Sequence, residues 1–131
     1  MWKAIVAQPD GGLDALADVG PWYLLDGKLA FNNRAQLKTT PLASISIDEQ
    51  KRSQLQAANR CVWSGVQAGG APVPGCHAPD PTDPKVALGP WTFGEATQMG
   101  VVGTLDATDS KWIFNGATTC GGPCHLYCIE Q

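Results

Sequence analysis

Short apolar runs separated by turn residues make up most of this chain. The clearest pair lies within residues 22–31, where Trp-Tyr-Leu-Leu and Leu-Ala-Phe stand on either side of a segment that begins with Asp26 and Gly27. An Asp-Gly pair supplies the positive backbone φ angles that a tight hairpin turn requires. The pattern therefore predicts a β-hairpin in this segment.

Alternation of apolar and polar residues predicts further strands. Residues 2–8 form one such run before Pro9, and Ile45 and Ile47 alternate with polar neighbours in another. The remaining candidates are short runs rich in Val, Ile and aromatic residues, at 61–65, 91–93, 101–102, 112–114 and 126–129.

Helical signals are confined to short segments. Residues 13–19 contain two leucines at helical spacing, and Asn32 or Asn33 can cap a short helix through Leu37. Residues 49–60 are polar and contain helix formers, which predicts a surface helix or an inserted loop. Together with the strands, these segments predict an α+β domain of small antiparallel sheets with short helices.

A long loop follows the strand predicted at 61–65. Residues 66–90 contain six prolines and one cysteine, Cys76, near their middle. Ordering irregular chain costs about 1–2 kcal/mol per residue, and a cross-link offsets about 2–4 kcal/mol of such a cost. Five cysteines in 131 residues fit that need and indicate an oxidising, extracellular compartment.

Charge and hydropathy argue against two classes of partner. The chain carries 9 basic and 12 acidic residues, a net charge of -3, and nothing basic that suggests nucleic acid. No run approaches the roughly 20 apolar residues of a membrane-spanning helix. The first eight residues hold too short an apolar stretch for a signal peptide, so we expect a trimmed or processed piece of a secreted or cell-surface protein.

Five tryptophans are many for a chain of this length. Four lie in apolar or alternating runs and are expected in the core: Trp2, Trp22, Trp63 and Trp112. Trp91 follows the Pro-rich loop and stands two residues before Phe93. These two rings are candidates for contacting a protein partner or a sugar ring. The alternative is that Trp91 packs under its own loop.

Two sets of side chains are candidate metal ligands. Zinc would be held by Cys120, Cys124, His125 and Cys128, with Cys61 or His77 assisting. In an oxidising compartment such cysteines more often form disulfides. A calcium ion would be held by oxygens of Asp80, Asp83 and Glu95, although acids beside prolines are more often turn residues. We therefore expect no metal and no cofactor.

Catalytic signals are weak. His125 directly follows Cys124, and His77 directly follows Cys76. Neighbours on a strand point to opposite faces, so neither pair makes the hydrogen bond of a nucleophile to its base. The chain also lacks a Gly-x-Ser-x-Gly elbow, a phosphate loop and a dinucleotide fingerprint. We expect no enzyme and assign no catalytic residue.

The order of several motifs resembles a known family. The motifs are Gly-Pro-Trp-Tyr-Leu-Leu-Asp-Gly at 20–27, Ile-Ser-Ile-Asp-Glu at 45–49, Val-Trp-Ser-Gly at 62–65, Cys76, Ala-Thr-Asp-Ser-Lys-Trp at 107–112, Cys120, and Leu-Tyr-Cys-Ile-Glu-Gln at 126–131. The chain is similar to the C-terminal half of the endostatin domain of collagens XV and XVIII. It is more similar to the DUF1554 family of bacterial surface-protein domains. The resemblance covers roughly the whole chain.

The resemblance implies a C-type-lectin-like fold, in which two small sheets support a long loop region and the termini pair as adjacent strands. Residues 1–131 would form one such domain without the family's first helix. Cys76 and Cys120 stand where the family's loop disulfide lies, and Cys61 and Cys124 are extra and available to each other. Cys128 stands where the family bridges to the first helix, so it is expected to be unpaired.

These observations favour a non-enzymatic extracellular recognition or adhesion module that binds a protein or matrix ligand through the loop region. The candidate ligand-binding residues are Trp91, Phe93, Asp80, Asp83 and Glu95. One alternative is a structural tip or assembly domain of a surface fibre, which would form a homo-oligomer. Another is a carbohydrate-binding lectin with a glycan ligand. The chain lacks the Glu-Pro-Asn, Gln-Pro-Asp and Trp-Asn-Asp triplets of calcium-dependent sugar binders.

Overall fold

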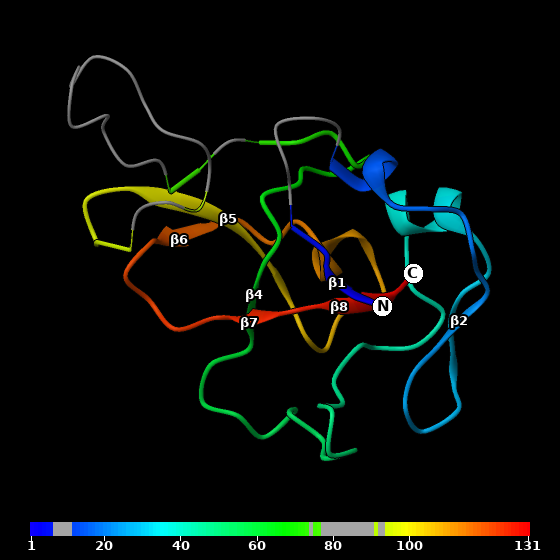
Figure 1. Ribbon diagram of the computed structural model, residues 1–131. Coiled ribbons are helices and arrows are strands. Elements are labelled where there is room, and N and C mark those ends of the chain that lie inside the picture. Colours follow the sequence, from blue (N-terminus) through cyan, green and yellow to red (C-terminus); the bar gives the residue numbers. More distant parts are fainter. Residues whose placement is uncertain (7–11, 74, 77–90, 92–93) are drawn as a thin grey trace.

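The computed structural model describes residues 1–6, 12–73, 75–76, 91 and 94–131. Eight short strands and three 3-10 helices lie in this part of the chain (Figure 1). The strands are β1 (Trp2–Ala4), β2 (Trp22–Tyr23), β3 (Leu29–Phe31), β4 (Cys61–Trp63), β5 (Met99–Thr104), β6 (Ala117–Thr119), β7 (His125–Leu126) and β8 (Cys128–Glu130). The helices are η1 (Gly12–Ala15), η2 (Arg34–Lys38) and η3 (Ser110–Trp112). The described part is thus mostly β.

The strands form three small sheets. The largest has the order β6-β5-β4-β7, in which β4 pairs antiparallel with β5 and parallel with β7. The hairpin β2-β3 and the ribbon β1-β8 are two-stranded and antiparallel. The prediction of small antiparallel sheets is therefore confirmed, except for the parallel pair.

Local turn chemistry explains the hairpin. Trp22 lies opposite Phe31 across the β2-β3 pair. At the turn Gly27 has a φ of 88°, and its amide donates to the Leu24 carbonyl oxygen at 2.8 Å. A side chain at that φ is disfavoured, so the glycine is required there. The predicted hairpin is confirmed.

The capped helix that was predicted to follow the hairpin is η2. The Asn33 side-chain oxygen accepts from the Gln36 amide at 3.1 Å, which satisfies a free donor at the start of the helix. The single turn places Leu37, which is 0% exposed, in the core. The other predicted helix, over 13–19, is shorter than expected, because η1 ends at Ala15.

The two ends of the chain lie side by side in the β1-β8 ribbon (Figure 1). Trp2 lies opposite Glu130. Beyond them the Met1 amine donates to the Gln131 carbonyl oxygen at 3.0 Å, and the Gln131 amide donates to the Met1 carbonyl oxygen at 2.7 Å. The resemblance implied this pairing of the termini.

The strand predicted at 112–114 is wrong. Trp112 is the last residue of η3, which starts because Asp109 accepts a hydrogen bond from the Lys111 amide at 2.9 Å. Three apolar residues in a row fit a buried helical turn as well as a strand. The neighbouring strand β6 has the polar sequence Ala-Thr-Thr and was not predicted.

Residues 45–60 differ in part from the prediction. In the expected strand, Ile47 forms only an isolated bridge. Of the two predictions for 49–60, the surface helix is wrong and the inserted loop is confirmed. Asp48 organises this loop by accepting from the amide of Arg52 and the side chains of Arg52 and Gln54, each at 2.8 Å. Burial alone would raise the pKa of Asp48, but the hydrogen bonds and the Arg52 charge outweigh it and lower that pKa.

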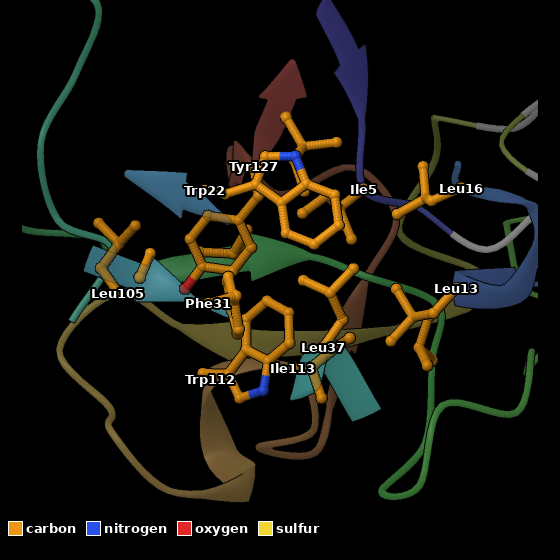
Figure 2. Packing of buried hydrophobic residues seen from close by; sticks show 14 residues of the cluster. Ile5, Leu13, Leu16, Trp22, Phe31, Leu37, Leu105, Trp112, Ile113 and Tyr127 are labelled. Carbon is orange, nitrogen blue, oxygen red and sulfur yellow. The ribbon is translucent and has the colours of Figure 1, made fainter. Parts of the chain in front are cut away.

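The core is one cluster between the ribbon, the hairpin and η3 (Figure 2). Trp112 is 0% exposed, and its ring centroid lies 5.0 Å from that of Phe31 and 5.6 Å from that of Tyr127. The Trp112 indole donates to the Thr39 carbonyl oxygen at 3.0 Å. The aromatic residues thus join segments far apart in the sequence.

The tryptophan predictions are correct for Trp22 and Trp112, which are buried. Trp63 is half-buried. The prediction for Trp2 is wrong, because its side chain is 58% exposed. Alternation shows which residues share a face of a strand, but it does not show which face is covered.

Candidate functional site

The long loop is closed at its base by a disulfide. Cys76 and Cys120 are bonded, with their Cα atoms 5.6 Å apart, and both are buried. Cys120 follows β6 directly, and its amide donates to the Gln98 carbonyl oxygen just before β5 at 2.9 Å. The disulfide therefore fastens the loop to the β5-β6 edge of the large sheet. It is the pair that the resemblance implied.

Trp91 returns the chain to the same base. Its amide donates to the Gly75 carbonyl oxygen at 3.3 Å, and its ring meets the Trp63 ring edge-on at a centroid distance of 5.7 Å. Because Gly75 precedes Cys76, Trp91 and Cys76 lie at neighbouring points of this base. Of the two interpretations of Trp91, the structure favours packing at the base of its own loop.

Gly100 on β5 makes this close approach possible. A Cβ atom there would lie 2.7 Å from the Trp63 ring and 2.8 Å from the Cys76 sulfur. Contacts below 3.0 Å do not occur for real Cβ atoms, so any larger residue would push the disulfide or the ring aside. The bare backbone of β5 thus lets both groups pack on it.

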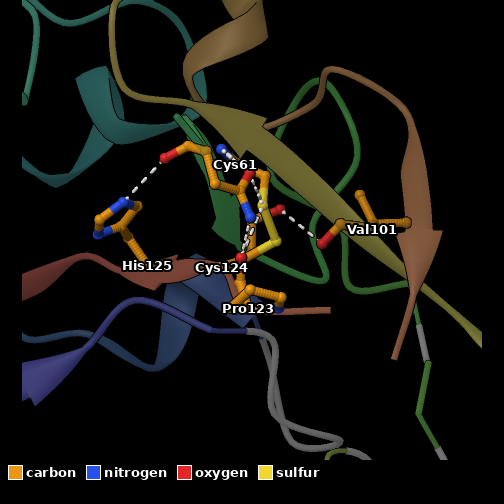
Figure 3. Close-up of a disulfide and its surroundings, with 7 residues drawn as sticks. Cys61, Val101, Pro123, Cys124 and His125 are labelled. Atoms are coloured by element: carbon orange, nitrogen blue, oxygen red, sulfur yellow. Dashed lines mark hydrogen bonds between the residues drawn. A yellow bond between two sulfur atoms is a disulfide. The ribbon is translucent and has the colours of Figure 1, made fainter. Parts of the chain in front are cut away.

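A second disulfide joins Cys61 of β4 to Cys124 just before β7, with Cα atoms 5.0 Å apart (Figure 3). Asn59 bridges the same two segments. Its side-chain amide donates to the Pro123 carbonyl oxygen, and its own carbonyl oxygen accepts from His125 Nε2 at 3.0 Å. His125 is therefore a structural partner of the backbone beside a disulfide.

Only part of the proposed ligand-binding set can be placed. Glu95 is exposed, with its backbone beside Gly121, which follows Cys120, and Trp91 is half-buried. Phe93, Asp80 and Asp83 lie outside the described residues. The structure therefore brings Trp91 and Glu95 to the same end of the large sheet and does not test the other three.

The four candidate zinc ligands are divided among different interactions. Cys120 and Cys124 are in separate disulfides, and Cys128 is an exposed free thiol. No group of three or more His, Cys, Asp or Glu side chains within the described ranges is arranged to hold a metal ion. The calcium interpretation involves Asp80 and Asp83, which are outside those ranges.

A shallow polar depression of about 510 Å³ lies beyond the far end of β5 and is open to solvent. Asp106 on its wall accepts from the Thr104 hydroxyl and from Arg60, each at 2.8 Å. These hydrogen bonds and the Arg60 charge lower the pKa of Asp106. Thr104 and Arg60 thus keep the Asp106 carboxylate ionised, which fits a structural role for Asp106.

A smaller and more apolar groove, of about 210 Å³, lies between the β1-β8 ribbon and the β2-β3 hairpin. Its floor is formed by core residues that include Trp22 and Ile129. Its rim includes Trp2, 58% exposed, and Tyr23, 60% exposed. No local pattern in the sequence indicates this groove, because its walls come from both ends of the chain and from the hairpin.

Tyr127, which lines the same groove, is a buried titratable residue with a shifted pKa. The Tyr127 hydroxyl donates to the Thr104 carbonyl oxygen at 3.1 Å, and burial, with a smaller contribution from Asp106, raises the pKa of Tyr127. Tyr127 therefore stays neutral as part of the groove floor.

Comparisons with protein-family models, with curated proteins and with solved structures find no match to the chain. Within residues 1–6, 12–73, 75–76, 91 and 94–131, no helix is long and apolar enough to cross a membrane.

Proposed function

We propose that the chain is a non-enzymatic extracellular recognition module of C-type-lectin-like fold, which binds a protein or matrix ligand through the loop that starts at Cys76. The observation that supports this proposal is the closed loop base. The disulfide to Cys120 and the amide bond from Trp91 to Gly75 hold both ends of the loop on one sheet edge. Loops fixed on a rigid scaffold often carry recognition.

Rigid ends favour binding for an energetic reason. A segment whose ends are already fixed loses less conformational entropy when a partner arrives than a free segment does. The two disulfides also support an extracellular location, since such bonds persist in oxidising compartments. The resemblance of the motif order to that of bacterial surface-protein domains supports a position on a cell surface.

Loop replacement tests this proposal. Residues 78–89 are replaced by a Gly-Ser linker of equal length, and both proteins are applied to arrays of matrix proteins and of glycans, with and without a chelator. We expect the parent chain to bind at least one protein, and the replaced chain to lose that binding while keeping its melting temperature. Binding that survives loop replacement, or no protein binding at all, would contradict the proposal.

The main alternative is a structural assembly domain. The free thiol of Cys128 on the exposed face of β8 is the observation that favours it. Light scattering separates the two interpretations, because an assembly domain forms a stable oligomer in the absence of any ligand. The lectin alternative is tested on the glycan array, where it requires binding that the chelator abolishes.

A further inference from the structure

The groove beside the β1-β8 ribbon is bounded by an unpaired strand edge. Met1 and Gln131 exchange two backbone hydrogen bonds, and the Ile5 amide donates to the Tyr127 carbonyl oxygen at 2.7 Å. In an antiparallel pair, hydrogen-bonded and non-hydrogen-bonded positions alternate. The backbone groups of Cys128 and Glu130 must therefore point away from β1, toward the outer edge of β8.

This outer edge faces the groove. The Trp22 indole of the hairpin donates to the Glu130 carbonyl oxygen at 3.0 Å, which places β2 along that side of β8. The amide and carbonyl of Cys128, two residues earlier, have no hydrogen-bond partner within the described part of the chain. The Cys128 amide and carbonyl are therefore a hydrogen-bond donor and acceptor with which the backbone of an added β-strand could pair.

Aromatic rings and one carboxylate surround these backbone groups. Trp2 and Glu130 lie opposite each other and project from the same face of the ribbon, with Tyr23 exposed across the groove. Glu130 forms no ion pair with any residue that the structure describes. Lys3, the nearest base along β1, alternates to the other face.

A cation is the group that this arrangement fits. A Lys or Arg side chain can lay its apolar stem on an indole and place its charge beside a carboxylate. The net charge of -3 also favours the approach of a basic partner.

We propose that this groove binds an extended basic segment of a partner protein, which pairs with the Cys128 backbone and places a Lys or Arg side chain between Trp2 and Glu130. This surface is separate from the loop beyond Cys76, so the inference does not depend on the function proposed above. A second copy of the chain is a poor occupant. Two-fold pairing of β8 with itself, centred on Cys128, would place each Glu130 opposite Leu126 of the other copy and would supply no cation for the carboxylate.

Selection from a phage-displayed library of random decapeptides on the intact, oxidised protein tests the inference. We expect the selected peptides to share a Lys or Arg within a run of β-branched residues. Synthetic versions should bind Trp2→Ala at least about tenfold more weakly and Glu130→Gln about fivefold more weakly. N-methylation of the peptide backbone at the position opposite Cys128 should also abolish binding.

Matched controls are available elsewhere on the surface. Leu42 is 53% exposed, and Glu49 is exposed, with its carboxylate accepting a hydrogen bond from the neighbouring Gln50 side chain. Leu42→Ala and Glu49→Gln should therefore leave the affinity unchanged. Trp2 and Glu130 are both exposed, so their variants should keep the parent melting temperature.

Cys128 supplies a second measurement at the same place. A bound peptide should slow alkylation of this thiol by iodoacetamide at least about fivefold, because the added strand would cover its edge. The inference is wrong if no peptide is selected, if the selected peptides lack basic residues, or if Trp2→Ala and Glu130→Gln bind as the parent does. It is equally wrong if the protein alone forms a dimer that protects Cys128.

Discussion

The base of the long loop and the ribbon of the two termini both join distant parts of the chain, but by different means. At the loop base, a disulfide joins Cys76 to Cys120, and the Trp63 ring meets the Trp91 ring edge-on. The ribbon contains a cysteine as well, but the thiol of Cys128 is free. Backbone hydrogen bonds and buried side chains hold the ribbon together.

The two regions are held by different means because the hydrophobic core includes the ribbon but not the loop base. Ile5, Tyr127 and Ile129 of the ribbon region belong to the main core cluster. The disulfide at the loop base is buried but lies outside that cluster, as do Val101 and Val102 of β5. Where the core ends, a cross-link supplies the stability that apolar burial supplies elsewhere.

Replacing Cys76 and Cys120 together by serine should have the largest effect, and it should be confined to the loop base. The bond closes a sequence separation of 44 residues, for which chain entropy predicts a loss of about 4 kcal/mol. Urea unfolding measures the loss, and limited proteolysis should show early cleavage between 77 and 99. Unchanged unfolding and cleavage would show that the bond does not hold the loop.

Ile129→Ala should loosen the ribbon instead. The side chain is 4% exposed, and deleting it from the core should cost about 3 kcal/mol. Cys128 should then react faster with iodoacetamide, while cleavage of the loop stays at the parent rate. Leu126→Ala is the control, since Leu126 is 54% exposed and its loss should be nearly neutral. A faster cleavage of the loop in Ile129→Ala would mean that the two regions are not independent.

Gly100→Ala tests the packing at the loop base without removing the disulfide. The added methyl group would overlap the Trp63 ring and the Cys76 sulfur, with an expected cost of about 1–3 kcal/mol. The matched change Gly94→Ala meets no atom of the described residues within 4 Å and should be tolerated. Equal melting temperatures of the two variants would argue against the close approach of β5 to the disulfide.

Asp106→Asn, at the opposite end of β5 from the disulfide, should have the smallest effect on stability. The Thr104 hydroxyl and Arg60 lower the pKa of this carboxyl, so its contribution is present above the ordinary carboxyl range and is lost as the pH falls through the lowered pKa. Both side chains are partly exposed, which limits the contribution to below about 1 kcal/mol. Urea unfolding at pH 7 and pH 3 should show a smaller pH dependence in Asp106→Asn than in the parent chain.

Local chemistry explains what could be predicted from the sequence. The hairpin depends on Gly27 at its turn, and η2 depends on the Asn33 cap, so a few adjacent residues determine each. The two disulfide pairs agree with the arrangement implied by the family resemblance. A single sequence gives no such connectivity, because five cysteines allow 15 ways to form two pairs.

Tertiary contacts explain what could not be predicted. Trp112 lies in a short apolar run, but Asp109 and burial against Phe31 make it the end of a helical turn. Trp2 has the alternation of a core strand, yet the ribbon's outer face is left uncovered. The groove combines residues near both termini with the hairpin, so no local pattern could indicate it.

Peptide mapping of the alkylated, oxidised protein by mass spectrometry tests the sulfur framework most directly. Iodoacetamide applied before proteolysis should modify Cys128 alone, and the peptides should remain linked as Cys61 to Cys124 and Cys76 to Cys120. A different pairing, or three or more modified cysteines in the folded protein, would contradict a frame held by two disulfides.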